Sequence, residues 1–210
     1  MQKPNISDAV IRRMPKYFRY LDELVRQDME RISSKSLAEK MGLTASQIRQ
    51  DLNCFGEFGQ QGYGYNVKVL RDEIAKILGI NQSSTAILIG VGNLGKALIH
   101  NFSFDKRGFS LIGAFDNNPA LIGTTIKNTP VFDIATLPDF CKKHNPDVGV
   151  LTLPKDEAPG ICRILVDHGI KGIWNFANMD IKIDAPGVCI ENVHFSDSLM
   201  TLCYKITQTL

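Results

Sequence analysis

The sequence lacks any apolar run that approaches the roughly 20 residues needed to cross a membrane as a helix. Its first residues, MQKPNISDAVIRRM, also lack an apolar stretch followed by a small-residue cleavage site. We therefore expect a cytosolic protein. With 210 residues and 44% hydrophobic content, the chain has room for one large domain or for two smaller ones.

Cysteine patterns typical of disulfide-rich or zinc-binding proteins are absent as well. The cysteines are odd in number and scattered, without a C-x-x-C pair or histidines at zinc-ligand spacing (Cys54, Cys141, Cys162, Cys189 and Cys203). We therefore expect no disulfide framework and no metal site. These residues are interpreted as small buried side chains.

The sequence also has little net charge, +2 in all. Residues 1–80 contain 13 Lys and Arg against 10 Asp and Glu, a balance of +3, whereas residues 81–210 contain 11 against 12, a balance of −1. The mild positive excess at the N-terminal end is compatible with binding phosphates. It is equally compatible with a solvated surface of mixed charge.

The first 80 residues are patterned as helices followed by a hairpin. Apolar residues recur at helical spacing over 8–25, a second short helix stops at Gly42, and Thr44 with Gln47 forms a capping box for a third helix. Glycines among aromatics in GEFGQQGYGYNVKVL then predict a β-hairpin, and VLRDEIAKILGI predicts a fourth helix. A polar boundary follows near residue 80.

Three residues in this region are spaced as in a helix-turn-helix unit. Such a unit needs a small residue where its helices cross, a glycine at the turn and an aliphatic anchor in the second helix, and Ala38, Gly42 and Ile48 meet these requirements. With the hairpin they predict a winged helix whose third helix enters the major groove of DNA.

The third helix has a predicted buried stripe of Ile48, Leu52 and Phe55, and the opposite face is polar. That face could read base edges or hold phosphates, and an ordinary solvated face is the alternative. The residues predicted to contact DNA are Lys16, Ser46, Gln47, Arg49, Gln50 and Asn53, with Gln60, Gln61 and Tyr63 in the hairpin; Arg12, Arg13, Arg19 and Arg31 are further candidates for phosphate contacts.

Beyond residue 80, short apolar runs alternate with helical segments, which predicts a parallel sheet with crossover helices. The stretch TAILIGVGNLG runs from a strand into G-x-G-x-x-G and opens a helix, and Asp116 follows 21 residues after Gly95. In this pattern Gly90 permits a sharp turn, Gly92 lets a pyrophosphate approach the backbone, and Gly95 lets the helix approach the strand.

Asp116 indicates which dinucleotide the loop prefers. Its carboxylate can accept hydrogen bonds from an adenosine ribose, and it would repel a 2′-phosphate about 4 Å away by roughly 1 to 4 kcal/mol. The pattern therefore favours NAD(H) over NADP(H). S-adenosylmethionine, coenzyme A and a purely structural glycine turn are the alternatives.

A catalytic acid or base with an orienting partner is hard to find. His100, His144 and His168 fall in or at the ends of predicted helices, and Lys155 follows a strand without an evident partner. This favours a sensor without catalysis. The alternatives are a small NAD-dependent oxidoreductase with a helix-turn-helix appendage, and a winged-helix regulator that senses another nucleotide.

The order of these parts, with ASQIRQDLNCFGEFG, GYGYNV, IGVGNLG, FD and GIKGIWNFA, resembles the Rex family of bacterial redox-sensing transcriptional repressors. The resemblance runs from about Tyr17 to the C-terminus. It implies an α/β protein with a winged helix-turn-helix domain (1–80), a Rossmann-like NAD(H)-binding domain (81–194) and a C-terminal helix (195–210) that is exchanged within a homodimer. It also implies binding to an inverted-repeat operator, which NAD⁺ favours and NADH reverses.

The resemblance further implies roles for individual residues. Phe195 would begin the exchanged helix and reach the partner's nicotinamide, and Arg19 would link the DNA-binding domain to the dimer core. The residues implied to bind the cofactor are Gly90, Val91, Gly92, Asn93, Leu94, Gly95 and Asp116 on the adenosine side, and Leu153, Pro154, Asn175, Phe176 and Ala177 on the nicotinamide side.

The chain departs from the family pattern at three places. His194 stands where the family often has an aspartate that links to the first-helix arginine, so an ion pair with Arg19 is not available and the switch could respond to pH. Gln60 and Gln61 replace a basic pair in the wing, which predicts a weaker salt dependence of DNA binding. Asn178 replaces a proline beside the expected cofactor site.

Overall fold

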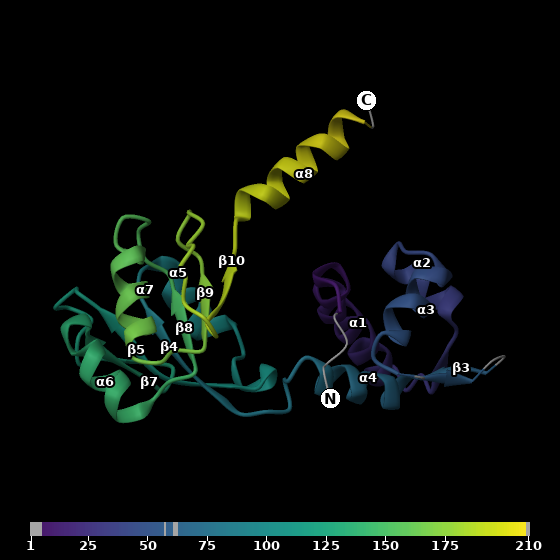
Figure 1. Ribbon diagram of the computed structural model, residues 1–210, viewed down its shortest axis with the longest axis horizontal. Helices are drawn as coiled ribbons and strands as arrows, with labels where there is room; N and C mark the ends of the chain where they lie inside the picture. The colour runs from purple at the N-terminus through teal and green to yellow at the C-terminus, as the bar shows by residue number, and fades with distance from the viewer. Residues whose placement is uncertain (1–5, 57, 61–62, 209–210) are drawn as a thin grey trace. The chain divides into compact units, whose positions relative to one another are not determined.

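The computed structural model describes residues 6–56, 58–60 and 63–208 of the chain. The chain divides into two compact units between Asn81 and Gln82. Figure 1 shows the helices and strands of both. Among the described residues, no helix is long and apolar enough to cross a membrane.

The first unit combines helices with a small antiparallel sheet. Its described elements are α1 (Asp8–Arg26), β1 (Arg31–Ile32), α2 (Ser34–Met41), α3 (Ala45–Asn53), β2 (Gly59–Gln60), β3 (Gly64–Asn66) and α4 (Val67–Ile77). The strands are ordered β1-β3-β2 with antiparallel pairing. The hairpin predicted from the glycines is confirmed as β2 and β3. β1 was not predicted, because two residues are too few to show a period.

The core of this unit forms along one face of α1. Met14, Tyr17, Leu21 and Leu24 recur every three or four residues and are almost fully buried. They share one cluster with buried side chains of the other three helices, among them Leu37, Ile48, Leu52, Leu70 and Ile74. Burying a side chain of this size stabilises the fold by about 1.5 to 3 kcal/mol. This core therefore holds α3 firmly in the unit.

Capping explains where α2 begins and ends and where α3 begins. The hydroxyl of Ser33 accepts a hydrogen bond from the Ser36 amide, and Gly42 ends α2 in the left-handed region with φ of +66°. The Thr44 hydroxyl accepts a hydrogen bond from the Gln47 amide at 3.1 Å. The capping box is only half formed, since the Gln47 side chain donates to Asp51.

The second unit is a doubly wound sheet with helices on both faces, followed by a C-terminal helix. Its described elements are β4 (Ser84–Ile89), α5 (Asn93–Asn101), η1 (Asp105–Arg107), β5 (Phe109–Asp116), β6 (Thr125–Ile126), β7 (Thr129–Asp133), η2 (Ile134–Thr136), α6 (Leu137–His144), β8 (Val148–Leu151), α7 (Ala158–Asp167), β9 (Gly172–Asn175), β10 (Cys189–Asn192) and α8 (Phe195–Thr207). The strand order is β10-β9-β8-β4-β5-β7-β6, and only the pairing of β6 with β7 is antiparallel among them. This confirms the predicted parallel sheet.

Successive side chains of β4 pack into two different clusters, one on each face of the sheet. Ile87 and Ile89 belong to a buried cluster that includes residues of α6 and α7, whereas Leu88 belongs to a second cluster with Ile99 of α5. Because successive side chains of a strand point to opposite faces, α6 and α7 cover one face and α5 covers the other (Figure 1).

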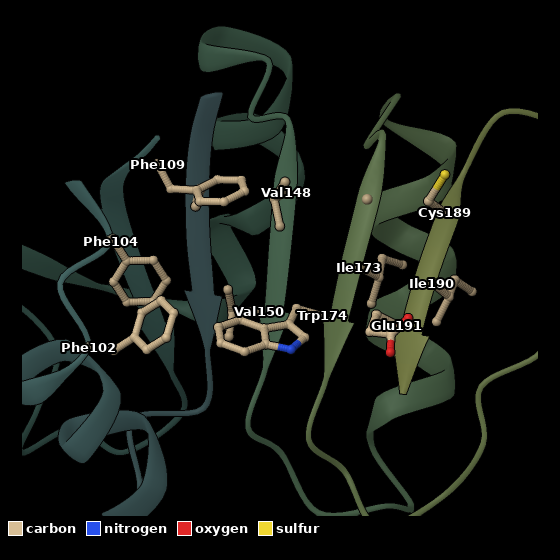
Figure 2. Close-up of a pocket in the computed structure, with 12 residues that line it drawn as sticks. Phe102, Phe104, Phe109, Val148, Val150, Ile173, Trp174, Cys189, Ile190 and Glu191 are labelled. Atoms are coloured by element: carbon tan, nitrogen blue, oxygen red, sulfur yellow. The ribbon is translucent and has the colours of Figure 1, made fainter. Parts of the chain in front are cut away.

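An apolar pocket of about 360 Å³ opens beside β8, β9 and β10. Figure 2 shows the rings of Phe102 and Phe104 on one side of it, Trp174 between, and Ile190 and Glu191 of β10 on the other side. The rings of Phe102 and Trp174 lie 5.0 Å apart. The lining is therefore aromatic and aliphatic.

Helix α8, which follows β10 and is yellow in Figure 1, has no buried residue. Its large apolar side chains are more than half exposed, namely Phe195, Leu199, Met200, Leu202, Tyr204 and Ile206. A helix with this composition is normally buried in its working state. Its apolar surface is thus left without cover in the single chain.

The expectation that the cysteines are buried is correct for two residues and wrong for three. Cys141 and Cys162 are buried under the sheet, and burial raises the pKa of Cys162 to about 11. Cys54, Cys189 and Cys203 are exposed, because they lie at the end of α3, on the edge strand β10 and on the uncovered α8.

Candidate functional sites

Several predicted cofactor residues meet at one edge of the sheet. The glycine loop follows β4, Asp116 ends β5, Leu153 and Pro154 follow β8, and residues 175–177 lie at the end of β9. These strands are parallel, so their carboxyl ends share an edge. From β4 the chain crosses to β5 on one side, and β8 lies on the other. Ligands of doubly wound sheets bind at such a switch point.

Two glycines of the loop are required by the packing of the protein itself. Gly90 has φ of +96°, and a Cβ there would lie 2.7 Å from the carbonyl oxygen of Thr152. A Cβ at Gly95 would overlap the carbonyl oxygen of Gly90. The Thr152 hydroxyl donates a hydrogen bond to that same carbonyl at 2.5 Å. The end of β8 therefore supports the turn after β4.

Gly92 has a different reason to be glycine. Its φ of −70° suits any residue, and a Cβ at this position would meet no protein atom within 4 Å. It is also the N-cap of α5, where no side chain caps the helix, so amides of Asn93 and Leu94 begin the first turn. An exposed space beside free helix amides fits a pyrophosphate. The residues present therefore fit a bound dinucleotide.

Asp116 is held in place beside the loop. One carboxylate oxygen accepts a hydrogen bond from the Val91 amide at 2.6 Å, and the other accepts from the Asn118 amide at 2.8 Å. Each oxygen retains a lone pair for a further donor. This geometry leaves a fixed negative charge and acceptors next to the loop, as a ribose diol requires.

On the nicotinamide side, Asn175 has a structural task. It is fully buried, its amide donates to the carbonyl of Met179 and to Asn192, and its oxygen accepts from the Ala177 amide. It thus shapes the loop after β9 and leaves little of its side chain for a ligand.

Phe176 and Phe195 extend this side of the site. The Phe176 ring lies 4.6 Å from Trp174 and 5.9 Å from Phe195 at the start of α8. Leu153 is half-buried and Pro154 is exposed. The structure therefore brings the predicted residues together at one rim, and their contact with a nicotinamide stays a prediction.

The candidate acids and bases do not form a catalytic group. His168 bonds to the carbonyl of Ile164 at 2.7 Å, and His144 stacks on Phe140 with ring centres 4.3 Å apart. His100 and Lys155 are exposed on the surface of the unit. Among the described residues, no cluster of three or more His, Cys, Asp or Glu could hold a metal.

The third helix presents part of its predicted face to solvent. Ser46, Arg49, Gln50 and Asn53 are exposed, while Ile48 and Leu52 are buried as expected. Arg49 donates a hydrogen bond to the Ser34 hydroxyl at the start of α2, at 3.2 Å. These side chains are therefore accessible to a ligand, and their contact with DNA stays a prediction.

One buried charge on this helix was missed by the sequence analysis. Asp51 is fully buried, and Arg13 of α1 binds both its oxygens, with N···O distances of 2.6 and 2.8 Å. Tyr17 and Gln47 also donate to it. Burial raises the pKa of Asp51, but the hydrogen bonds from Arg13, Gln47 and Tyr17 outweigh it and hold the pKa below its ordinary value. Asp51 lies three residues after the buried Ile48, the one local signal of its position.

Two candidates for phosphate contacts are therefore engaged inside the unit. Both oxygens of Asp51 bind the guanidinium of Arg13, and its contact with a phosphate stays a prediction. Lys16 donates to the carbonyl of Met41 at the end of α2, at 2.5 Å. Its contact with DNA stays a prediction.

The wing is described in part. Tyr63 is exposed, and the guanidinium of Arg31 lies 5.9 Å from the centre of its ring. Gln60 belongs to β2, whereas its side chain and the whole of Gln61 lie outside the described residues.

The two predicted switch residues lie in different units. Arg19 is exposed on α1. His194 is the N-cap residue of α8, and its Nε2 lies 2.8 Å from a carboxylate oxygen of Asp180. When the imidazole is protonated this contact is an ion pair, so His194 has an acidic partner within its own unit.

Comparisons with known proteins agree with this architecture. Residues 5–53 match the family model described as "Putative DNA-binding protein N-terminus", and residues 81–179 match the model described as "CoA binding domain". The redox-sensing transcriptional repressor Rex of Clostridium botulinum (strain Hall) is 53% identical over 99% of both chains.

Two solved structures are similar over nearly the whole chain. RSP in complex with β-NAD⁺ and operator DNA has a TM-score of 0.91 and 52% identity, covering 99% of this chain and 95% of that one. RSP in complex with β-NADH has a TM-score of 0.91 and 49% identity, covering 99% and 97%.

A helix-turn-helix unit joined to a Rossmann-like nucleotide-binding fold defines a DNA-binding regulator that responds to a nucleotide. The residues at both sites and the full-length relatives agree on this class. The chain belongs to the Rex family of redox-sensing transcriptional repressors. It is accordingly a regulator, and the alternative of a small oxidoreductase is not favoured.

Proposed function

We propose that this chain represses transcription by binding operator DNA as a homodimer, and that it leaves the DNA when NADH binds. NAD⁺ competes for the same site and favours the DNA-bound form. The observation that carries this proposal is the glycine loop at the switch point, whose Gly92 leaves space for a pyrophosphate, on the same chain as a helix-turn-helix unit. Operator DNA is in the cytoplasm of a bacterium, so this is where we place the protein.

The relatives support the choice of ligands. RSP, which is about half identical to this chain, is known both with β-NAD⁺ and operator DNA and with β-NADH. Asp116 favours an unphosphorylated ribose at this site. The "CoA binding domain" match covers the same fold, and it does not by itself distinguish coenzyme A from NAD(H).

In this proposal the exposed residues of α3 contact the operator. Arg49, Gln50 and Asn53 face the major groove, and the wing residues Gln60 and Gln61 with Tyr63 lie along the backbone. Dimerisation then sets the spacing between two half-sites. The exposed polar surface of α3 and the positive excess of the first 80 residues support this placement.

The homodimer is proposed to form through exchange of the C-terminal segment 195–210, which contains α8. The uncovered apolar side chains of α8 and the open apolar pocket beside β8 to β10 support this, because both surfaces would lose contact with water in a dimer. Phe195 would then lie near the partner's nicotinamide, and Arg19 and His194 stay the proposed switch residues.

NADH can move such a dimer only if it binds one form more tightly than the other. A ligand with equal affinity for the operator-bound and released forms would shift nothing. The nicotinamide half, where the two oxidation states differ in charge, is therefore expected to set the response, and the adenosine half supplies affinity common to both.

The proposal is tested by titrating a fluorescent operator duplex and the purified protein with NADH, NAD⁺ and NADPH while anisotropy is recorded. NADH is expected to release the DNA, whereas NAD⁺ and NADPH are not. Arg49→Ala is expected to lose operator binding and to keep NADH binding. If saturating NADH leaves the operator bound, the sensor function is wrong.

Asp116→Asn is expected to weaken the preference for NADH over NADPH by roughly tenfold or more, because it removes a charge that repels a 2′-phosphate. The Asn side chain has a single acceptor oxygen, so it keeps one of the two hydrogen bonds from the Val91 and Asn118 amides and loses the other. The ratio of the two dissociation constants, measured by nucleotide fluorescence, gives the result. Asp139→Asn removes a charge from the exposed side of α6 and serves as the control. An unchanged ratio in Asp116→Asn would exclude this role.

A further inference from the structure

The carboxylate of Asp51 accepts hydrogen bonds at four places. One oxygen accepts from Arg13 Nε at 2.6 Å and from the Tyr17 hydroxyl at 2.9 Å. The other accepts from Arg13 Nη2 at 2.8 Å and from Gln47 Nε2 at 2.8 Å. A carboxylate has about four lone-pair positions, so this one is fully used. Gln47 is the only one of these donors on α3 itself, and it lies at the start of that helix.

This contact settles which way the Gln47 amide faces. An ionised carboxylate accepts hydrogen bonds and cannot donate them. Burial raises the pKa of Asp51, but the hydrogen bonds, with those of Arg13 foremost, lower it by more, so the carboxyl stays ionised. Only the NH₂ side of the Gln47 amide can therefore face Asp51. The reversed amide would set two oxygens against each other in a buried place.

The rest of the Gln47 amide then has a defined chemistry. One N–H and the carbonyl oxygen Oε1 have no partner among the described residues. Gln47 is half-buried beside the exposed Ser46 and Gln50, on the surface of α3 that the proposed function directs at DNA. A donor and an acceptor side by side match the N7 and N6 positions of adenine in the major groove.

We propose that Asp51 is a positioning residue that fixes the Gln47 amide so that it reads an adenine in each operator half-site. The inference rests on the proposed DNA-binding function and adds to it one base preference and the residue that sets it. Arg13 and Tyr17 hold the carboxylate, Asp51 holds the amide, and the amide contacts the base. Without Asp51, the Gln47 side chain could present either its oxygen or its NH₂ group to a given atom of the base.

The test begins with the full-length protein and an operator selected from a random duplex library. Every base pair of one half-site is then changed in turn, and 7-deazaadenine, which lacks the N7 acceptor, replaces each adenine. We expect one A·T pair whose replacement weakens wild-type binding about five- to 150-fold, the discrimination of a bidentate contact. Gln47→Met, which keeps the length of the side chain and removes its amide, is expected to bind the changed duplexes and the original equally at that pair.

Asp51→Ala, which leaves the Gln47 amide without its acceptor, is expected to lose the same preference, and the double variant with Gln47→Met should lose nothing more at that pair. Leu24→Ala is the control for stability, because it opens a cavity in the same core about two turns of α1 after Tyr17 and removes no hydrogen-bonding group. It should lower the melting temperature and keep the preference. This separates positioning from a merely structural role.

Two outcomes would overturn the inference. One is an unchanged preference at every base pair in Gln47→Met, and the other is an Asp51→Ala protein that folds and keeps the adenine preference. If Asp51→Ala does not fold, exchange of the side-chain amide protons of wild-type Gln47 is followed by NMR instead. One amide proton protected from exchange supports the contact, and two freely exchanging protons refute it. Failure of the wild type to select any duplex would instead refute the proposed function.

Discussion

Gly92→Leu is expected to leave this protein folded and bound to its operator but unable to respond to NADH. The position tolerates a side chain, because its φ of −70° is ordinary and a Cβ would meet no protein atom within 4 Å. The same side chain would fill the space where the pyrophosphate reaches the amides of α5. We expect the NADH dissociation constant to rise about 100-fold or more, a loss of roughly 2.7 kcal/mol or more.

Two measurements check this prediction. NADH fluorescence gives the affinity, and operator anisotropy shows whether added NADH still releases the DNA. Gly92→Ala should give a smaller loss, since it adds one methyl group. The contrast is Gly95→Ala, whose Cβ would overlap the Gly90 carbonyl, so it should lower the stability of the second unit by about 1 to 3 kcal/mol as overpacking does. Wild-type NADH affinity in Gly92→Leu would show that the loop does not hold the phosphates.

The features that could be predicted from the sequence are those with local causes. The glycine at the end of α2, the Thr44 cap and the strand-loop-helix run around Gly90 all depend on residues within a few positions of each other. Alternation in the strands and helical spacing in α1 are local too. The parallel sheet could be predicted from the alternation of strands and helices along the chain, because parallel strands need crossover connections.

The features that escaped prediction depend on contacts between distant residues. Arg13 and Asp51 are 38 positions apart, and nothing in the local pattern pairs them. Gln47 was correctly placed three residues after a cap, but its side chain donates to the charged Asp51 instead of accepting from the Thr44 amide. The exposure of Cys189 and Cys203 likewise depends on the sheet edge and on a helix that lacks a partner in the single chain.

Charge placed on the apolar stripe of α8 is expected to abolish the dimer and, with it, most of the operator affinity. Phe195, Leu199, Leu202 and Ile206 are spaced by four, three and four residues, so they line one side of the helix, and all are more than half exposed. A stripe of this kind is costly in water and is covered in a helix that packs on a partner. Leu199→Glu with Leu202→Glu would set two carboxylates in that interface.

We expect the double variant to be monomeric by light scattering and to bind the operator about 100-fold more weakly or worse, because a monomer engages one half-site and loses the gain from joining two. Thr201→Glu adds a charge on the flank of the same helix and should remain dimeric. Circular dichroism should be similar for both proteins, which excludes unfolding as the cause. A double variant that stays dimeric would mean that the subunits pair through another surface, and the open pocket beside β8 to β10 would then be the next place to introduce charge.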